Sequence, residues 1–131
     1  MGAVSERVEI EIAAAAPGVP LVRHALRGLL SGLEVDDDVI ADIALAVTEA
    51  CTNVVIHAYA DAEGPMEIRA ALGDSELSVV VRDDGRGVVP RADSPGLGLG
   101  LPLIATLTES LELGTGEDDA TEVRMTFRVE G

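Results

Sequence analysis

The run Glu76-Leu-Ser-Val-Val-Val-Arg82, continued by Asp83-Asp-Gly-Arg-Gly87, is the stretch on which the organisation of this chain depends. The first part is β-branched and partly alternating, so it predicts a strand, and the glycines break the chain directly after it. Asp83 is thereby placed at the end of a strand. Because glycine lacks a Cβ, Gly85 and Gly87 can adopt positive φ and let a flat ligand lie against the backbone. Alone, this motif is equally typical of an ordinary Asp-Gly turn.

A long helical pattern precedes this strand, from Asp36 to Tyr59. Glu49 and Asn53 are i and i+4 neighbours on a polar face that also carries Asp42 and His57, so a carboxylate and an amide can point at one object. A solvated helix face would show the same polar pattern. The apolar residues recur at spacings of three and four, which predicts one broad face packed on a core: Val39, Ile43, Val47, Ala50, Val54 and Ala58.

A glycine-rich segment follows the strand. Gly96, Gly98 and Gly100 alternate with leucines, among them Leu99, and the helical run Pro102–Leu107 comes next. A glycine loop that opens into a helix presents unpaired N–H groups and the positive end of the helix dipole, which is typical of a phosphate site. A flexible loop followed by a helix-start proline would show the same pattern. The pattern is not a P-loop, because all nine basic residues are arginine and the required lysine does not exist.

In this order the three stretches resemble the N, G1 and G2 boxes of the GHKL (Bergerat-fold) ATPase and kinase superfamily. Within this superfamily, the chain is most similar to the anti-sigma-factor serine/threonine-protein kinases. The similarity lies in the sequence Glu49-Ala-Cys-Thr-Asn53-Val-Val-Ile-His57-Ala-Tyr59. The resemblance covers about Pro17 to Val129. It implies an α+β fold, a two-layer α/β sandwich with a mixed, mainly antiparallel sheet and three helices on one face, with ATP and Mg²⁺ as cofactors.

The resemblance also implies roles for single residues. Glu49 would be the catalytic base that orients and deprotonates a serine hydroxyl or a water, and Asn53 would bind Mg²⁺. Asp83 would accept a hydrogen bond from the adenine amino group. The full set of implied cofactor-binding residues is Asn53, His57, Asp83, Gly85, Gly87, Gly96, Gly98, Leu99, Gly100 and Thr121.

Two features depart from the family pattern. The lid between the second and third boxes, Val88–Pro95, is short and holds one basic residue, Arg91. Thr121 is present, but Ala120 stands where the family usually has glycine. If that position needs positive φ, alanine costs on the order of 1 kcal/mol, and nucleotide affinity would fall.

Length and composition restrict the class of protein. The 131 residues predict one domain, 1–131, with an aliphatic core, since aromatic residues make up 2%. A formal net charge of −15 without aromatic stacking platforms argues against nucleic acid. A single cysteine, Cys51, fits core packing in a reducing compartment. With no apolar run approaching 18 residues and no signal-peptide pattern, we expect a cytoplasmic protein without a membrane span.

The remaining elements follow from periodicity. We expect a strand at Arg7–Ile12, a helix from Pro20 to near Gly32, and a hairpin of Met66–Leu72 with Leu77–Arg82. The helix after the third box is expected to run to about Leu111. Two closing strands are expected at Glu112–Thr115 and Thr121–Val129.

The leading functional hypothesis, implied by the resemblance, is an ATP-binding anti-sigma factor and serine/threonine-protein kinase. As a homodimer it would hold a sigma factor and phosphorylate a STAS-type anti-anti-sigma protein. The alternative is a non-catalytic, nucleotide-gated partner-binding module of the same fold, which the short lid and Ala120 favour. A histidine-kinase catalytic domain without its dimerisation helices ranks third, and gyrase-like or chaperone-like ATPases rank lower.

Overall fold

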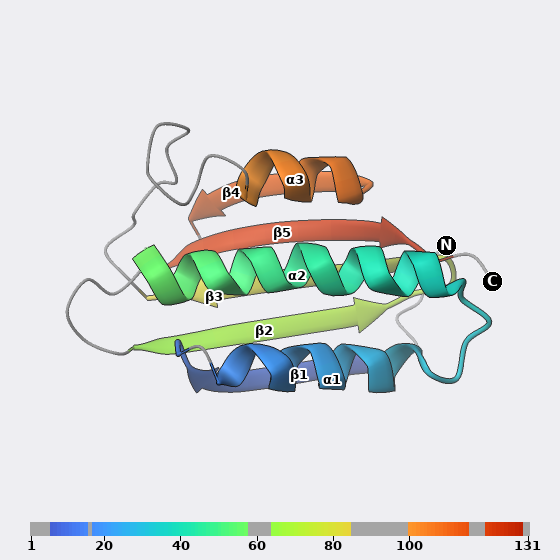
Figure 1. Ribbon diagram of the computed structural model, residues 1–131, viewed down its shortest axis with the longest axis horizontal. Coiled ribbons are helices and arrows are strands. Elements are labelled where there is room, and N and C mark those ends of the chain that lie inside the picture. Colours follow the sequence, from blue (N-terminus) through green and yellow to red (C-terminus); the bar gives the residue numbers. More distant parts are fainter. Residues whose placement is uncertain (1–5, 16, 58–63, 85–99, 116–119, 130–131) are drawn as a thin grey trace.

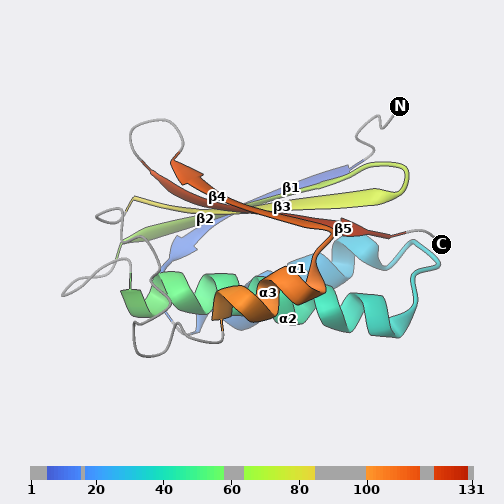
Figure 2. The same cartoon turned by 90° about the horizontal axis from the view of Figure 1, so that it is seen from above.

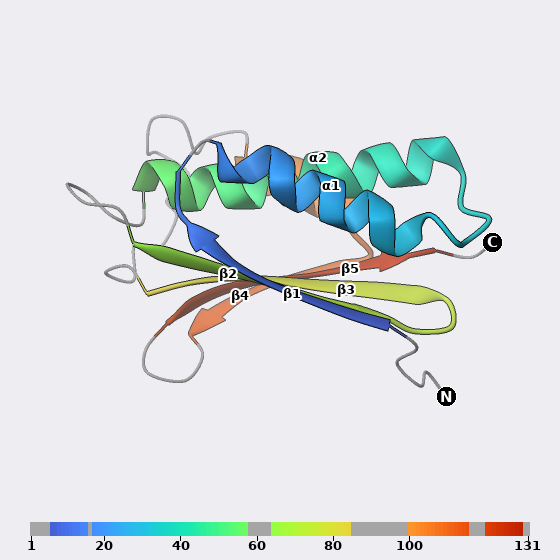
Figure 3. The same ribbon diagram turned by 90° about the horizontal axis from the view of Figure 1, so that it is seen from below.

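The computed structural model describes residues 6–15, 17–57, 64–84, 100–115 and 120–129 (Figure 1). Its sheet has the strand order β1-β2-β3-β5-β4, and its helices cover one face of that sheet (Figures 2 and 3). The α+β two-layer sandwich is thus confirmed, with the refinement that all four strand pairings are antiparallel. In chain order the elements are β1 (Glu6–Ala13), α1 (Gly18–Leu30), α2 (Asp37–His57), β2 (Pro65–Leu72), β3 (Glu76–Asp83), α3 (Gly100–Leu107), β4 (Ser110–Thr115) and β5 (Thr121–Arg128).

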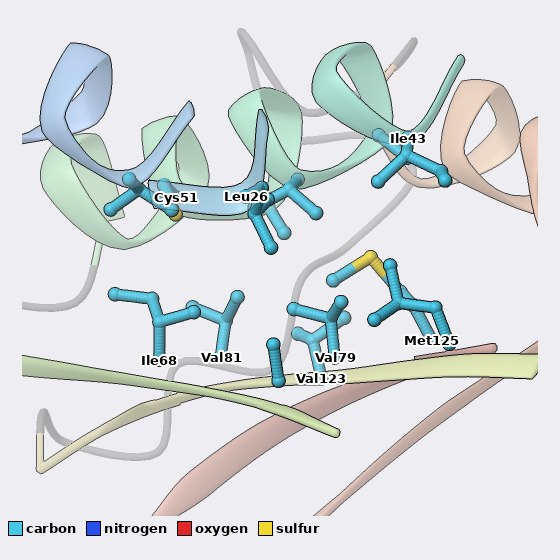
Figure 4. Close-up of a cluster of buried hydrophobic side chains, with 14 of the residues drawn as sticks. Leu26, Ile43, Cys51, Ile68, Val79, Val81, Val123 and Met125 are labelled. Atoms are coloured by element: carbon cyan, nitrogen blue, oxygen red, sulfur yellow. The ribbon is translucent and has the colours of Figure 1, made fainter. Parts of the chain in front are cut away.

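The core lies between the sheet and the helices, where alternate strand residues meet the apolar face of α2. In β3 the side chains of Leu77, Val79 and Val81 are buried, while those between them are only partly covered. Figure 4 shows Cys51 of α2 and Val81 of β3 on opposite sides of this core, each pointing into it. Burial of aliphatic side chains therefore holds the two layers together.

The helix α2 is the central element of the helical layer, since it packs against α1, α3 and β3. By length and composition alone its Asp37–Ile56 segment, with a mean hydropathy of 1.8, is apolar enough to cross a membrane. In the structure, however, its apolar face is used by the core, because Ile43, Val47 and Val54 are buried. A core helix of a two-layer fold gives the same composition as a membrane span.

The third helix is shorter than its periodicity predicts, so the expected boundary at Leu111 is wrong. α3 ends at Leu107, and the backbone N–H of Glu109 already donates to the carbonyl of Thr126 in β5, at 2.7 Å. The hydroxyl of Ser110 and that of Thr126 are 2.6 Å apart. Pairing with β5 offers these residues a ladder of hydrogen bonds, which overrides the weak local preference for helix.

Candidate functional site

Three of the predicted site segments meet at one end of the molecule. The C-terminal half of α2, the end of β3 and the beginning of β5 lie at the left-hand end in Figure 1, and Figure 2 agrees. Residue Asp83 is the direct register partner of Thr121. α3 begins at the same end and packs against α2. The antiparallel register of β3 and β5 therefore brings together residues that are far apart in sequence.

Asp83 occupies a position that is polar by sequence and buried by structure. It continues the inward row of β3 after Val79 and Val81, and its residue is only 6% exposed. Removing a carboxylate from water is costly unless it is hydrogen-bonded or neutralised. A carboxylate in this row is therefore typical of a recognition site at the margin of the core.

The hydroxyl of Thr121 is a second observation that bears on whether this margin fits a nucleotide. Its hydroxyl is buried, and it has no hydrogen-bond partner among the described residues. Glu122, the next residue, is also buried, but it accepts hydrogen bonds from Arg124 at 2.6 and 3.0 Å. A buried hydroxyl left without a partner costs about 1–3 kcal/mol. An unsatisfied hydroxyl opposite a buried carboxylate fits a ligand with donors and acceptors on one edge, as a purine has.

The polar face of α2 carries Glu49 and Asn53 as predicted, both partly buried. Their spacing of four residues places the carboxylate and the amide one above the other on the helix surface. His57 is the last residue of α2. These positions are compatible with the predicted roles, which themselves stay predictions.

Cys51 lies between those two residues in sequence but on the other side of the helix. It is fully buried, and burial raises the pKa of its thiol from 9.0 to about 12. A thiol that keeps its proton at neutral pH is a poor nucleophile. The interpretation of Cys51 as core packing is thus supported.

Several predicted residues lie outside the part of the chain that the structure describes. They are Gly85, Gly87, Gly96, Gly98 and Leu99, together with the lid Val88–Pro95. Gly100 is described and is the first residue of α3, as expected for a glycine run that opens into a helix. Ala120 is described as well, and it is 1% exposed within the core.

Within the described ranges, no three His, Cys, Asp or Glu side chains form a group that could hold a metal ion. Mg²⁺ needs six oxygens and usually keeps several waters, so a site here would depend on phosphate oxygens besides Asn53. A cavity of about 180 Å³ does exist nearby, but on the open face of the sheet. Its lining residues are Glu11, Pro65, Glu67, Arg69, Arg82 and Asp84.

Sequence reasoning missed two features of α2. The hydroxyl of Thr48, beside Glu49, is buried and has no hydrogen-bond partner in the described structure. Leu45 and Ile56 are 41% and 56% exposed, although both are large and apolar. A signal for the second feature was present, since neither residue belongs to the apolar spacing that predicted the buried face.

Comparison with known proteins gives results that are consistent with the family that the sequence resembles. The sequence profile of the family described as histidine kinase-like ATPase domain matches residues 12–127. Serine-protein kinase RsbW of Bacillus thuringiensis (strain Al Hakam) is 33% identical over 136 residues, which cover 92% of this chain and 84% of that protein. Serine-protein kinase RsbW of Bacillus anthracis (strain CDC 684 / NRRL 3495) is 32% identical over the same shares.

Among solved structures, the RsbU and RsbW domains of Rv1364c from Mycobacterium tuberculosis superpose with a TM-score of 0.74 and 26% identity. The superposition covers 95% of this chain but only 33% of that longer chain. The overall α+β fold described above is therefore shared with a known structure.

Proposed function

The chain belongs to the family of histidine kinase-like ATPase domains, and on that premise we propose that it binds ATP with Mg²⁺ and phosphorylates a serine of a partner protein. The partner would be a STAS-type anti-anti-sigma protein, and the same chain, as a cytoplasmic homodimer, would hold a sigma factor. The relatives named serine-protein kinase support this proposal at about one-third identity over most of the chain.

One observation carries the nucleotide part of the proposal. Asp83 is buried in register with Thr121, whose hydroxyl is buried without a partner among the described residues. A fold that needed only stability would place an apolar side chain at position 121, because a buried hydroxyl without a partner lowers the free energy of unfolding. An adenine edge would use both groups.

Each residue has a distinct task in the proposed reaction. Bound ATP would supply the phosphoryl group, with Mg²⁺ neutralising its charge. Glu49 would orient the serine hydroxyl and take its proton, and Asn53 would hold the metal through its amide oxygen. Asp83 would accept a hydrogen bond from the adenine amino group and repel the carbonyl that guanine carries there.

Nucleotide binding is tested by thermal melting with ATP, with and without Mg²⁺. Ligand at a hundred times its Kd stabilises by about 2.7 kcal/mol, which raises Tm by on the order of 10 °C for a domain of this size. The rise should depend on Mg²⁺ and shrink in Asn53→Ala, while Asp74→Asn, in the exposed hairpin at the other end, should behave as the parent. A parent protein that shows no rise in any condition would contradict the proposal.

Phosphotransfer is tested by incubation with Mg-ATP and purified STAS-type proteins, followed by detection of phosphoserine. Glu49→Gln should lose transfer but keep the ATP-dependent rise in Tm, because the proposed base does not hold the nucleotide. Glu76→Gln, which changes an exposed carboxylate at the opposite end of β3, is the matched control. A rise in Tm without phosphoserine from the parent would favour the non-catalytic, nucleotide-gated module.

A further inference from the structure

An exposed ridge runs along α2 on the side away from the sheet. It consists of Leu45, Glu49, Thr52 and Ile56, spaced by four, three and four residues, so the four side chains follow one stripe of the helix. We call it the Glu49 ridge. Its two apolar ends, Leu45 and Ile56, are 41% and 56% exposed, and its two middle residues are partly buried.

A single exposed leucine is ordinary on a protein surface, but the arrangement of this pair is informative. α2 already buries a complete apolar face on the core, including Val47, Ala50 and Val54, so folding does not require the pair. Both side chains stand on the same stripe as the proposed catalytic base, one on each side of it. Apolar surface that flanks a reactive carboxylate is suited to a protein that must approach that carboxylate.

The charge on the same side of α2 is complementary to a basic partner. Asp38 and Asp42 lie within about 60° of the ridge at 100° per residue, and both are exposed. α2 contains no arginine or lysine to balance them. The half of the ridge towards the N-terminus of α2 is therefore negative, while the other half ends in the apolar Ile56.

From this continuity of apolar surface, base and negative charge, we propose that the Glu49 ridge is the docking face for the phosphoacceptor segment of the protein substrate. The inference rests on the proposed kinase function. At 1.5 Å of rise per residue, Leu45 lies about 6 Å from Glu49 along the helix axis and Ile56 about 10 Å on the other side. The substrate would place an apolar side chain against each and a basic side chain near Asp42.

Binding is measured first, because it does not depend on turnover. Benzoylphenylalanine in place of Thr52 should photo-cross-link a purified STAS-type anti-anti-sigma protein, whereas the same group in place of Asp74, in the exposed hairpin, should not. Leu45→Ser and Ile56→Ser should each raise the Kd for that protein about tenfold, as expected when a buried apolar contact is lost. Leu113→Ser is the control, since Leu113 is 47% exposed on the edge strand β4.

Kinetics then separate docking from chemistry. The ridge variants should raise KM about tenfold with kcat within about twofold of the parent, and their ATP-dependent rise in Tm should be unchanged. Asp42→Arg should raise KM in the same way, by repelling the basic side chain. Equal Kd values for the ridge variants, the control and the parent would overturn the proposal, as would cross-links from position 52 to a second copy of this chain only.

The result also distinguishes failure of the docking face from failure of the proposed function. Cross-linking at position 52 without phosphoserine would support the docking face and contradict the kinase. Phosphoserine that forms normally in both ridge variants, without cross-linking at position 52, would support the kinase and overturn the docking face.

Discussion

Two inward-facing residue pairs, one near each end of the β3–β5 ladder, differ in chemistry. At one end Leu77 faces Phe127, and these residues are 0% and 3% exposed. Near the other end Asp83, 6% exposed, is paired with Thr121, whose buried hydroxyl has no hydrogen-bond partner among the described residues. The first end contributes stability through apolar burial, whereas the second depends on stability supplied elsewhere. A buried polar pair at a sheet end is therefore informative about ligands in a way that a buried apolar pair is not.

The largest expected effect belongs to the apolar end. Phe127→Ala should lower the free energy of unfolding by about 3–5 kcal/mol, because it removes a large buried side chain and leaves a cavity. Urea unfolding measures the loss, and the milder Leu77→Val provides a second variant if the first does not fold. Nucleotide-dependent stabilisation should persist wherever the variant is folded. Loss of nucleotide binding in a folded Leu77→Val protein would break the distinction between the two ends.

At the polar end, a substitution should change ATP affinity strongly and stability little. Asp83→Leu extends the apolar row of β3, so the free energy of unfolding without nucleotide should change by no more than about 1 kcal/mol. ATP affinity should fall roughly 10- to 150-fold, since a hydrogen bond to a charged group contributes about 1.5–3 kcal/mol. Isothermal titration calorimetry gives the affinity. Unchanged ATP binding would remove Asp83 from the proposed adenine site.

Cys51 belongs to the apolar core, although in sequence it lies between two predicted site residues. The pKa of the Cys51 thiol in the folded protein, about 12, lies above the ordinary 9.0. The contribution of the protonated thiol to the free energy of unfolding is therefore complete below pH 9 and declines as pH rises from about 9 to 12. By pH 10 the parent should lose about 1 kcal/mol more stability than Cys51→Ala. Native protein at pH 8 should also react slowly with thiol reagents. Labelling at the rate of the unfolded chain would instead assign Cys51 to the accessible site.

The smallest effect on stability is expected at Thr121. Thr121→Val replaces a hydroxyl that lacks a partner in the described part of the chain with a methyl group of the same shape, so the free energy of unfolding should stay constant or rise by up to about 1 kcal/mol. ATP affinity should fall by roughly three- to tenfold, about the contribution of one hydrogen bond. Paired melting and calorimetry measure both quantities. A clear loss of stability would mean that the hydroxyl serves the fold.

Several elements followed from sequence because their signals are local. The alternation in Glu76–Arg82 and the helical spacing from Asp36 onward predicted β3 and α2 closely. The end of α3 was mispredicted, because Glu109 and Ser110 pair with Thr126 of a strand that comes later in the chain. A periodicity argument examines neighbours in sequence, and it has no access to such a partner.

The sequence by itself determined the order of the three boxes, the apolar face of α2 and the end of the predicted strand at Asp83. These follow from side-chain periods of 2 and 3.6 and from glycine chemistry, which act over a few residues. Only the tertiary structure decided that Asp83 is buried and that it lies opposite Thr121. Strand register and helix packing join residues distant in sequence, so burial and partnership are set by the whole fold.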